Sequence, residues 1–176
     1  MNWLSRGFWS GIMATGPMTL AMFRIHRELP NEDQRPLPPA FLSDRIGEAA
    51  HASQHMTHEQ RSNFMMASHF GFGVASGSLY SALPIQLKRR PVTAGVLYGL
   101  GVWSVSYLGW IPAFGLRPSA SKTSAERNIM MILAHVVWGA SLGYSDRELQ
   151  SRSRQLLDGR TDQSPDDEQS RPPYYH

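Results

Sequence analysis

Four long stretches of the chain contain no Asp, Glu, Lys or Arg, and this feature constrains the fold more than any other. They cover residues 7–23, 62–87, 91–116 and 128–145, about half of the 176-residue chain, and every charged side chain lies in the other half. A transmembrane helix needs ~20 mostly apolar residues (about 17–25). The pattern therefore predicts an all-α membrane protein, a bundle of four transmembrane helices with spans of about 7–24, 62–87, 91–116 and 128–145.

The composition argues against several other classes of protein. The chain has no cysteine, which excludes disulfides, thiolate metal sites and a cysteine nucleophile. Its isoelectric point is about 9.5, but the basic residues flank the apolar stretches and form no continuous stripe, so we expect no nucleic-acid partner. Only Arg6 precedes the first stretch, and no small-residue cleavage site precedes Arg24. We therefore expect an uncleaved first span rather than a signal peptide.

The basic residues next to the predicted spans indicate how the chain is oriented. Residues 88–90 (Lys-Arg-Arg) form the short turn between the second and third spans, Arg6 precedes the first span, and several arginines follow the fourth. Segment 24–61 holds nearly equal numbers of basic and acidic residues. Because basic residues collect on the cytoplasmic side of membrane proteins, we expect both termini and the 88–90 turn in the cytoplasm. Segments 24–61 and 117–127 then face outward.

The segments between and after the spans have patterns of their own. Residues 43–56 have an amphipathic helical pattern, which predicts a segment lying at the outer interface between spans 1 and 2. Residues 57–60 and 123–126 both match the capping box and predict helix starts just ahead of spans 2 and 4. One or two helical turns are expected to continue as far as Leu157. Otherwise residues 146–176, rich in Arg, Asp, Ser and Gln, are predicted to form a largely disordered cytoplasmic tail.

Every predicted span also contains one GxxxG motif. The four motifs are Gly7/Gly11, Gly73/Gly77, Gly95/Gly99 and Gly139/Gly143. Small residues four positions apart let helix backbones approach closely in lipid. One motif in each span favours a tightly packed bundle, and the same faces are candidates for contact with a second copy or another membrane protein.

Spans 2 and 4 share a longer pattern that places a histidine inside each of them. Both read H-x-x-x-G-x-x-x-G, starting at His69 and His135, and each histidine follows a capping Thr by 12 residues. The match predicts two parallel hairpin repeats. At ~1.5 Å per residue, both imidazoles lie on the order of 10 Å inside the outer edge. At that level we expect a polar layer. Span 3 would contribute Tyr107 to it. Span 1 would contribute the carbonyl of Met13, which has no helical hydrogen bond because Pro17 lacks an N–H.

Three interpretations of the histidine pair stay open, of which the first is favoured. In the first, each imidazole bonds to a carbonyl, a tyrosine or the other imidazole and holds the helices together. In the second, His69 and His135 are axial ligands of a b-type haem. The third is a metal, quinone or lipid-headgroup pocket. A proton-coupled transporter is disfavoured, because none of the charge-free stretches contains Asp or Glu, the usual relay residues.

A second group of histidines lies on the segment between spans 1 and 2. His51, His55 and His58 recur at helical spacing near Glu48, and two histidines four apart can chelate a divalent metal. The capping box at Thr57 ends the helix before His58, which leaves His51, His55 and Glu48 as candidate ligands. A solvated polar face is the alternative, and the pattern favours it.

A set of motifs covers roughly residues 1–145. They are Pro36-Leu-Pro-Pro39, His69-Phe-Gly-Phe-Gly73 with Tyr80, Gly99-Leu-Gly-Val-Trp103, Tyr107-Leu-Gly-Trp-Ile-Pro-Ala-Phe-Gly-Leu116, Arg127-Asn128 and His135-Val-Val-Trp-Gly139. In this combination the chain resembles the YagU-like family of bacterial inner-membrane proteins. The resemblance implies a multi-pass protein of the inner membrane, and it supplies no reaction or ligand.

We therefore expect a non-catalytic integral membrane protein with a structural or partner-binding role, surrounded by the lipid bilayer. The alternative is a membrane-embedded cofactor or small-molecule site between spans 2 and 4, formed by His69, His135 and Tyr107.

Overall fold

The structure is a computed structural model, and it describes residues 1–29, 57–115, 121 and 123–161. Within these ranges the fold is all-helical, with no residue in a β-strand. This confirms the predicted all-α class. The amphipathic segment 43–56, with the candidate metal ligands Glu48, His51 and His55, lies outside the described residues.

The described chain forms four long helical segments, which coincide with the four charge-free stretches. They are α1 (Trp3–Glu28), α3 (His58–Ala82), the broken helix made of α4 (Pro91–Ser104), η4 (Val105–Trp110) and α5 (Ile111–Ala113), and α6 (Ala125–Thr161). A short 3-10 turn, η3 (Ile85–Lys88), connects α3 to α4. Each charge-free stretch thus lies largely within one of four helical segments.

One of the two predicted helix starts has the expected cap. At the start of α3, Thr57 and Gln60 form the capping box: the Thr57 side chain accepts from the Gln60 N–H at 3.2 Å, and the Thr57 N–H donates to Gln60 Oε1 at 2.8 Å. The α6 helix begins at Ala125. Ser124, rather than the predicted Thr123, therefore precedes its first helical residue.

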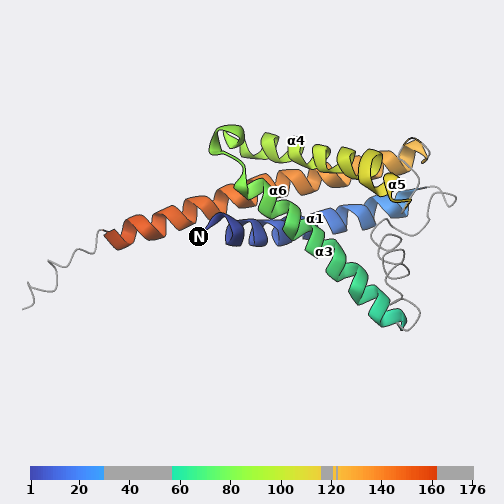
Figure 1. The fold of residues 1–176 in the computed structure, drawn as a ribbon, viewed down its shortest axis with the longest axis horizontal. Helices are drawn as coiled ribbons and strands as arrows, with labels where there is room; N and C mark the ends of the chain where they lie inside the picture. Colours follow the sequence, from blue (N-terminus) through green and yellow to red (C-terminus); the bar gives the residue numbers. More distant parts are fainter. Residues whose placement is uncertain (30–56, 116–120, 122, 162–176) are drawn as a thin grey trace, which may run out of the picture.

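The α6 helix does not end at the last residue of the fourth stretch. It continues to Thr161 and protrudes beyond the other helices (Figure 1). An ion pair one helical turn apart, Arg152 Nε to Glu148 Oε1 at 2.8 Å, supports this extension. The helix thus includes the turns that were expected as far as Leu157 and ends slightly later, at Thr161, while the rest of the predicted tail lies outside the described residues.

The helices pack in the order α3, α1, α6, α4. Figure 1 shows α6 between α4 and α1, with α3 crossing α1 obliquely. The interfaces α1–α3, α1–α6 and α4–α6 are extensive, whereas α3 and α4 contact each other mainly through long side chains such as Tyr80 and Tyr98. The chain thus consists of two hairpins, α1/α3 and α4/α6, joined through α1 and α6.

The GxxxG motifs form the contact inside each hairpin. In α1/α3, a Cβ added at Gly77 would lie 2.8 Å from the Cα of Gly11. In α4/α6, a Cβ added at Gly99 would lie 2.5 Å from the carbonyl oxygen of His135. These distances are shorter than any side chain tolerates, so the backbones meet only because these positions are glycine. All four motifs are used within the chain, so a partner would have to bind another surface.

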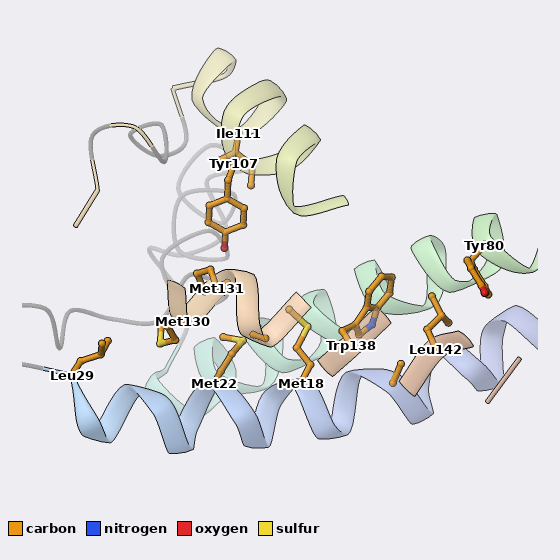
Figure 2. Packing of buried hydrophobic residues seen from close by; sticks show 12 residues of the cluster. Met18, Met22, Leu29, Tyr80, Tyr107, Ile111, Met130, Met131, Trp138 and Leu142 are labelled. Atoms are coloured by element: carbon orange, nitrogen blue, oxygen red, sulfur yellow. The ribbon is translucent and has the colours of Figure 1, made fainter. Parts of the chain in front are cut away.

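The buried apolar side chains lie mainly between α1 and α6. Figure 2 shows Met18 and Met22 of α1 beside the α6 residues Met130 and Trp138. Methionine is flexible enough to fill the irregular space between two helices that cross at an angle. This cluster joins the two hairpins to each other.

The described helices combine a mixed interior with apolar outward faces. Beside the apolar cluster, the buried side chains include the polar or charged residues Ser10, Thr15, Ser76, Ser78, Ser81, Lys88, Ser106, Arg127, His135, Ser145 and Asp146. Large apolar side chains point outward on every helix, for example Leu20, Leu79, Leu97 and Leu133.

By length and hydropathy alone, one described helical segment, Pro91–Ala113, is apolar enough to cross a membrane. It corresponds to the third predicted span. The other three helices do not meet this hydropathy criterion, although each contains a long charge-free stretch. The four-span bundle was predicted from the absence of charge, and the hydropathy criterion does not confirm it for spans 1, 2 and 4.

Candidate functional site

His135 lies inside the fold, in the half that contains the start of α6. Its side chain is 6% exposed, and its Nδ1 lies 2.8 Å from the carbonyl oxygen of Met131, one turn earlier. A carbonyl oxygen can only accept, so Nδ1 carries the proton. In the neutral imidazole Nε2 then has a free lone pair.

Tyr107 reaches His135 from a distorted part of the third helix. The segment η4 (Val105–Trp110) is a π-helix, and Gly109 within it has non-helical angles (φ −106°, ψ −107°). The Tyr107 ring packs edge-on against His135, with centroids 6.1 Å apart, and stacks on Trp103 at 6.2 Å. A π-turn is often found at functional sites because it redirects side chains. The continuous helix predicted over 91–116 is therefore broken where it supplies Tyr107.

His69 completes this group from α3. Its imidazole is half-buried and close enough to His135 for the two rings to interact electrostatically. The Nε2 atom of His69 is buried without a hydrogen-bond partner, and so is Nε1 of Trp103. The structure thus brings together the three side chains selected from the sequence, His69, Tyr107 and His135, from three different helices. We call them, with Trp103, the histidine layer.

Span 1 contributes to the interior differently from the prediction. Met13 is 54% exposed and Pro17 is also exposed, so neither lies in the histidine layer. The buried face of α1 instead includes Gly11 and Thr15, and Thr15 Oγ1 donates to the Gly11 carbonyl at 2.8 Å. The prediction was wrong because the glycine contacts with α3 fix which face of α1 points inward, and Pro17 lies off that face.

A second polar group, which the sequence did not predict, lies at the other end of the fold. Asp146 of α6 accepts from Arg6 Nε of α1 at 2.7 Å and from Lys88 Nζ at 3.1 Å. The Ser81 hydroxyl also donates to Asp146, at 2.5 Å. Arg6 and Lys88 donate in addition to the Ser81 carbonyl, at 2.8 and 3.1 Å. We call Arg6, Ser81, Lys88 and Asp146 the charge cluster, and the end of the molecule that contains it the Lys88 end.

The charge cluster is buried and nearly saturated with hydrogen bonds. Lys88 is only 4% exposed, and its ammonium also lies 5.1 Å from the ring centroid of Tyr80. Burial alone would raise the pKa of Asp146, but the hydrogen bonds from Ser81 and Arg6 and the charges of Lys88 and Arg6 outweigh it and lower that pKa below its usual value. The ionised carboxylate therefore joins the ends of α1, α3 and α6 to the turn before α4.

The sequence did contain a signal for this cluster. In the sequence analysis, Arg6 and Lys88 were interpreted only as residues that mark the cytoplasmic side, and such residues are expected to be solvated. Asp146 is the first charged residue after the fourth stretch, Arg6 the last before the first stretch, and Lys88 the first after the second stretch. In an antiparallel arrangement these three positions fall at the same end, so a single acid among bases there indicates an ion pair.

The candidate metal ligands Glu48, His51 and His55 cannot be placed, because they lie outside the described residues. In the part of the chain that is described, no group of three or more His, Cys, Asp or Glu side chains is arranged to hold a metal ion.

Two glycine-packed hairpins, a histidine layer and a buried charge cluster together define an all-helical protein with a polar interior. Residues 24–144 match the family described as "Protein of unknown function (DUF1440)", and the chain belongs to this family. No curated protein and no solved structure is significantly similar to it. The match confirms the expectation of an uncharacterised family.

Proposed function

We propose that the chain is a multi-pass protein of the bacterial inner membrane, in which all four helices cross the bilayer and the role is structural or partner-binding rather than catalytic. The observation that supports this most strongly is the combination of large apolar side chains on the outward faces with many polar side chains in the interior. The resemblance to the YagU-like family agrees with the same location.

The outward faces of the helices are apolar on all sides of the molecule. Leu20 of α1 is 67% exposed, Leu79 of α3 66% and Leu97 of α4 65%. Soluble monomers rarely expose apolar patches larger than a few hundred Å². A bilayer removes the cost of this exposure, because its hydrocarbon core is as apolar as these side chains.

The interior contacts are also of the kind that holds helices together in lipid. The Tyr98 hydroxyl donates to the Ser76 carbonyl at 2.8 Å, and the Tyr80 hydroxyl donates to the Pro91 carbonyl at 3.2 Å. Together with the glycine contacts, these bonds supply the close packing and interhelical hydrogen bonding that replace hydrophobic association in a membrane. A partner protein, or a second copy, would bind the outward apolar faces.

In this proposal the Lys88 end faces the cytoplasm. The exposed Arg89 and Arg90 lie there, as does the protruding end of α6 with Arg147 and Arg154. This distribution follows the positive-inside rule. It also places both chain termini on the cytoplasmic side, as in the sequence-based expectation.

Membrane fractionation tests the proposal. We expect the full chain to stay in the membrane pellet after washing at alkaline pH and to enter solution only with detergent, because its outward faces need an apolar surrounding. Release by the alkaline wash, or a soluble monomer without detergent, would overturn the proposal.

A second candidate function is a membrane-embedded cofactor or small-molecule site in the histidine layer. The observation that favours it is the pair of buried nitrogen atoms without partners, on His69 and Trp103, since each such atom costs several kcal/mol in an apolar surrounding. The absorption spectrum of the detergent-purified protein tests for haem. A Soret band that disappears in His69→Ala and His135→Ala would support axial ligation, whereas a colourless protein would exclude haem as the occupant.

A further inference from the structure

Four arginines that form no ion pair with a described residue lie at the Lys88 end. Arg89 and Arg90 are exposed in the turn that leads into α4, and Arg147 and Arg154 are exposed on α6. The ion pair between Lys88 and Asp146, at 3.1 Å, brings this turn against α6. Because Arg89 follows Lys88 and Arg147 follows Asp146 in sequence, both arginines lie next to this ion pair in the chain, at the same end of the molecule.

The acidic residues described at this end are already in use. Asp146 is shared by Arg6 and Lys88, so the buried charge cluster holds two cations and one anion. Glu148 is paired with Arg152 at 2.8 Å. We call the exposed Arg89, Arg90, Arg147 and Arg154 the arginine collar. They lie at the same end as a buried cluster that itself carries an excess positive charge.

The opposite end of the described helices has no such excess. There Arg24, Arg27, Arg61 and Arg127 are accompanied by Glu28, Glu59 and Glu126, which nearly balance them. Among the described residues, the excess positive charge is thus concentrated at the Lys88 end, next to apolar helix faces. A partner that meets this surface has to present several negative charges in a plane directly beside an apolar layer.

We propose that the arginine collar binds the phosphate headgroups of anionic phospholipids in the cytoplasmic leaflet. This inference rests on the proposed membrane location and adds a selectivity for one lipid class. Juxtamembrane basic residues are attracted to anionic headgroups, and the guanidinium group of arginine donates two parallel hydrogen bonds to a phosphate. The headgroups supply the counter-charge that the described part of the chain lacks at this end.

Native mass spectrometry of the full chain in detergent tests the proposal. The protein is mixed with equal amounts of phosphatidylglycerol and phosphatidylcholine that have the same acyl chains, and the two bound lipids are counted. We expect severalfold enrichment of phosphatidylglycerol on the wild-type protein. In the triple variant Arg89→Gln, Arg90→Gln, Arg147→Gln the two lipids should bind about equally.

The matched control is Arg24→Gln with Arg27→Gln, which removes exposed arginines at the opposite end. It should keep the enrichment, and circular dichroism should show that both variants are folded. Equal binding of the two lipids to the wild-type protein, or the same loss in both variants, would overturn the inference while leaving the membrane location intact. A protein that is soluble without detergent and binds neither lipid would overturn both.

Discussion

Replacing Gly95 by Ala should push α4 away from α6 and strongly destabilise the fold. A Cβ at this position would overlap the carbonyl oxygen of Gly139, and backbone atoms cannot move aside as a flexible side chain does. Overpacking in a close-packed interior costs about 1–3 kcal/mol, and more where the backbone has to shift. We therefore expect a loss of at least this size in the free energy of unfolding.

The same helix offers a matched control, Gly101→Ala. No atom lies within 4 Å of a Cβ at Gly101, and alanine is about 0.8–1.0 kcal/mol more favourable than glycine within a helix. This variant should be as stable as the wild type or slightly more stable. Unfolding by SDS in mixed micelles, followed by circular dichroism, measures both. Equal stability of the two variants would contradict the close contact between α4 and α6.

Asp146→Asn should have an effect of similar or larger size. The substitution preserves the shape of the side chain but leaves Arg6 and Lys88 buried without their anion. Removing one partner of a buried ion pair typically costs about 3–5 kcal/mol. The control is Glu148→Gln, which breaks an exposed pair on the same helix and should cost no more than about 0.5 kcal/mol.

A triple variant tests whether the stability lost in Asp146→Asn comes from unpaired buried charge or from changed packing. In Arg6→Leu, Lys88→Met, Asp146→Leu no buried charge is left unpaired, so we expect it to recover much of the stability lost in Asp146→Asn, as apolar replacements of buried ion pairs often do. Thermal unfolding followed by tryptophan fluorescence in detergent measures the series. If Asp146→Asn and Glu148→Gln have the same small effect, the cluster does not hold the helices together.

The helices and their pairing could be predicted from the sequence because they depend on local patterns. Charge-free stretches, the capping box at Thr57 and the GxxxG motifs are each contained in a single segment. The motifs predicted close packing, and the structure shows which of them meet: Gly7/Gly11 with Gly73/Gly77, and Gly95/Gly99 with Gly139/Gly143.

The features that could not be predicted depend on how the helices are rotated about their axes. Pro17 was assigned to the interior from its depth, but the rotation of α1 leaves it exposed. Lys88 was assigned to a solvated turn, but η3 folds it back onto the carbonyls of Tyr80 and Ser81, at 3.3 and 3.1 Å. The π-turn at Tyr107 likewise has no signature in residue spacing, because it forms where packing redirects the chain.

The histidine layer is an intermediate case. His69 and His135 were selected because each lies inside a charge-free stretch one turn before a glycine, and in the structure His135 packs against Tyr107 with His69 near His135. Their possible ligand was not predictable, because it depends on Nε2 of His69 and Nε1 of Trp103, whose lack of partners is a property of the packed helices.

The central claim, that the outward helix faces are in contact with lipid, can be tested by single-cysteine labelling, since the chain has no cysteine of its own. Cysteines are placed at the outward Leu20, Leu79, Leu97 and Leu133, one on each helix, and at Arg90 as the exposed control. In inverted inner-membrane vesicles, a membrane-impermeant maleimide should label Arg90→Cys readily and the four leucine positions only after the membrane is dissolved in SDS. Labelling of the four leucine positions as fast as Arg90→Cys in intact vesicles would contradict the account.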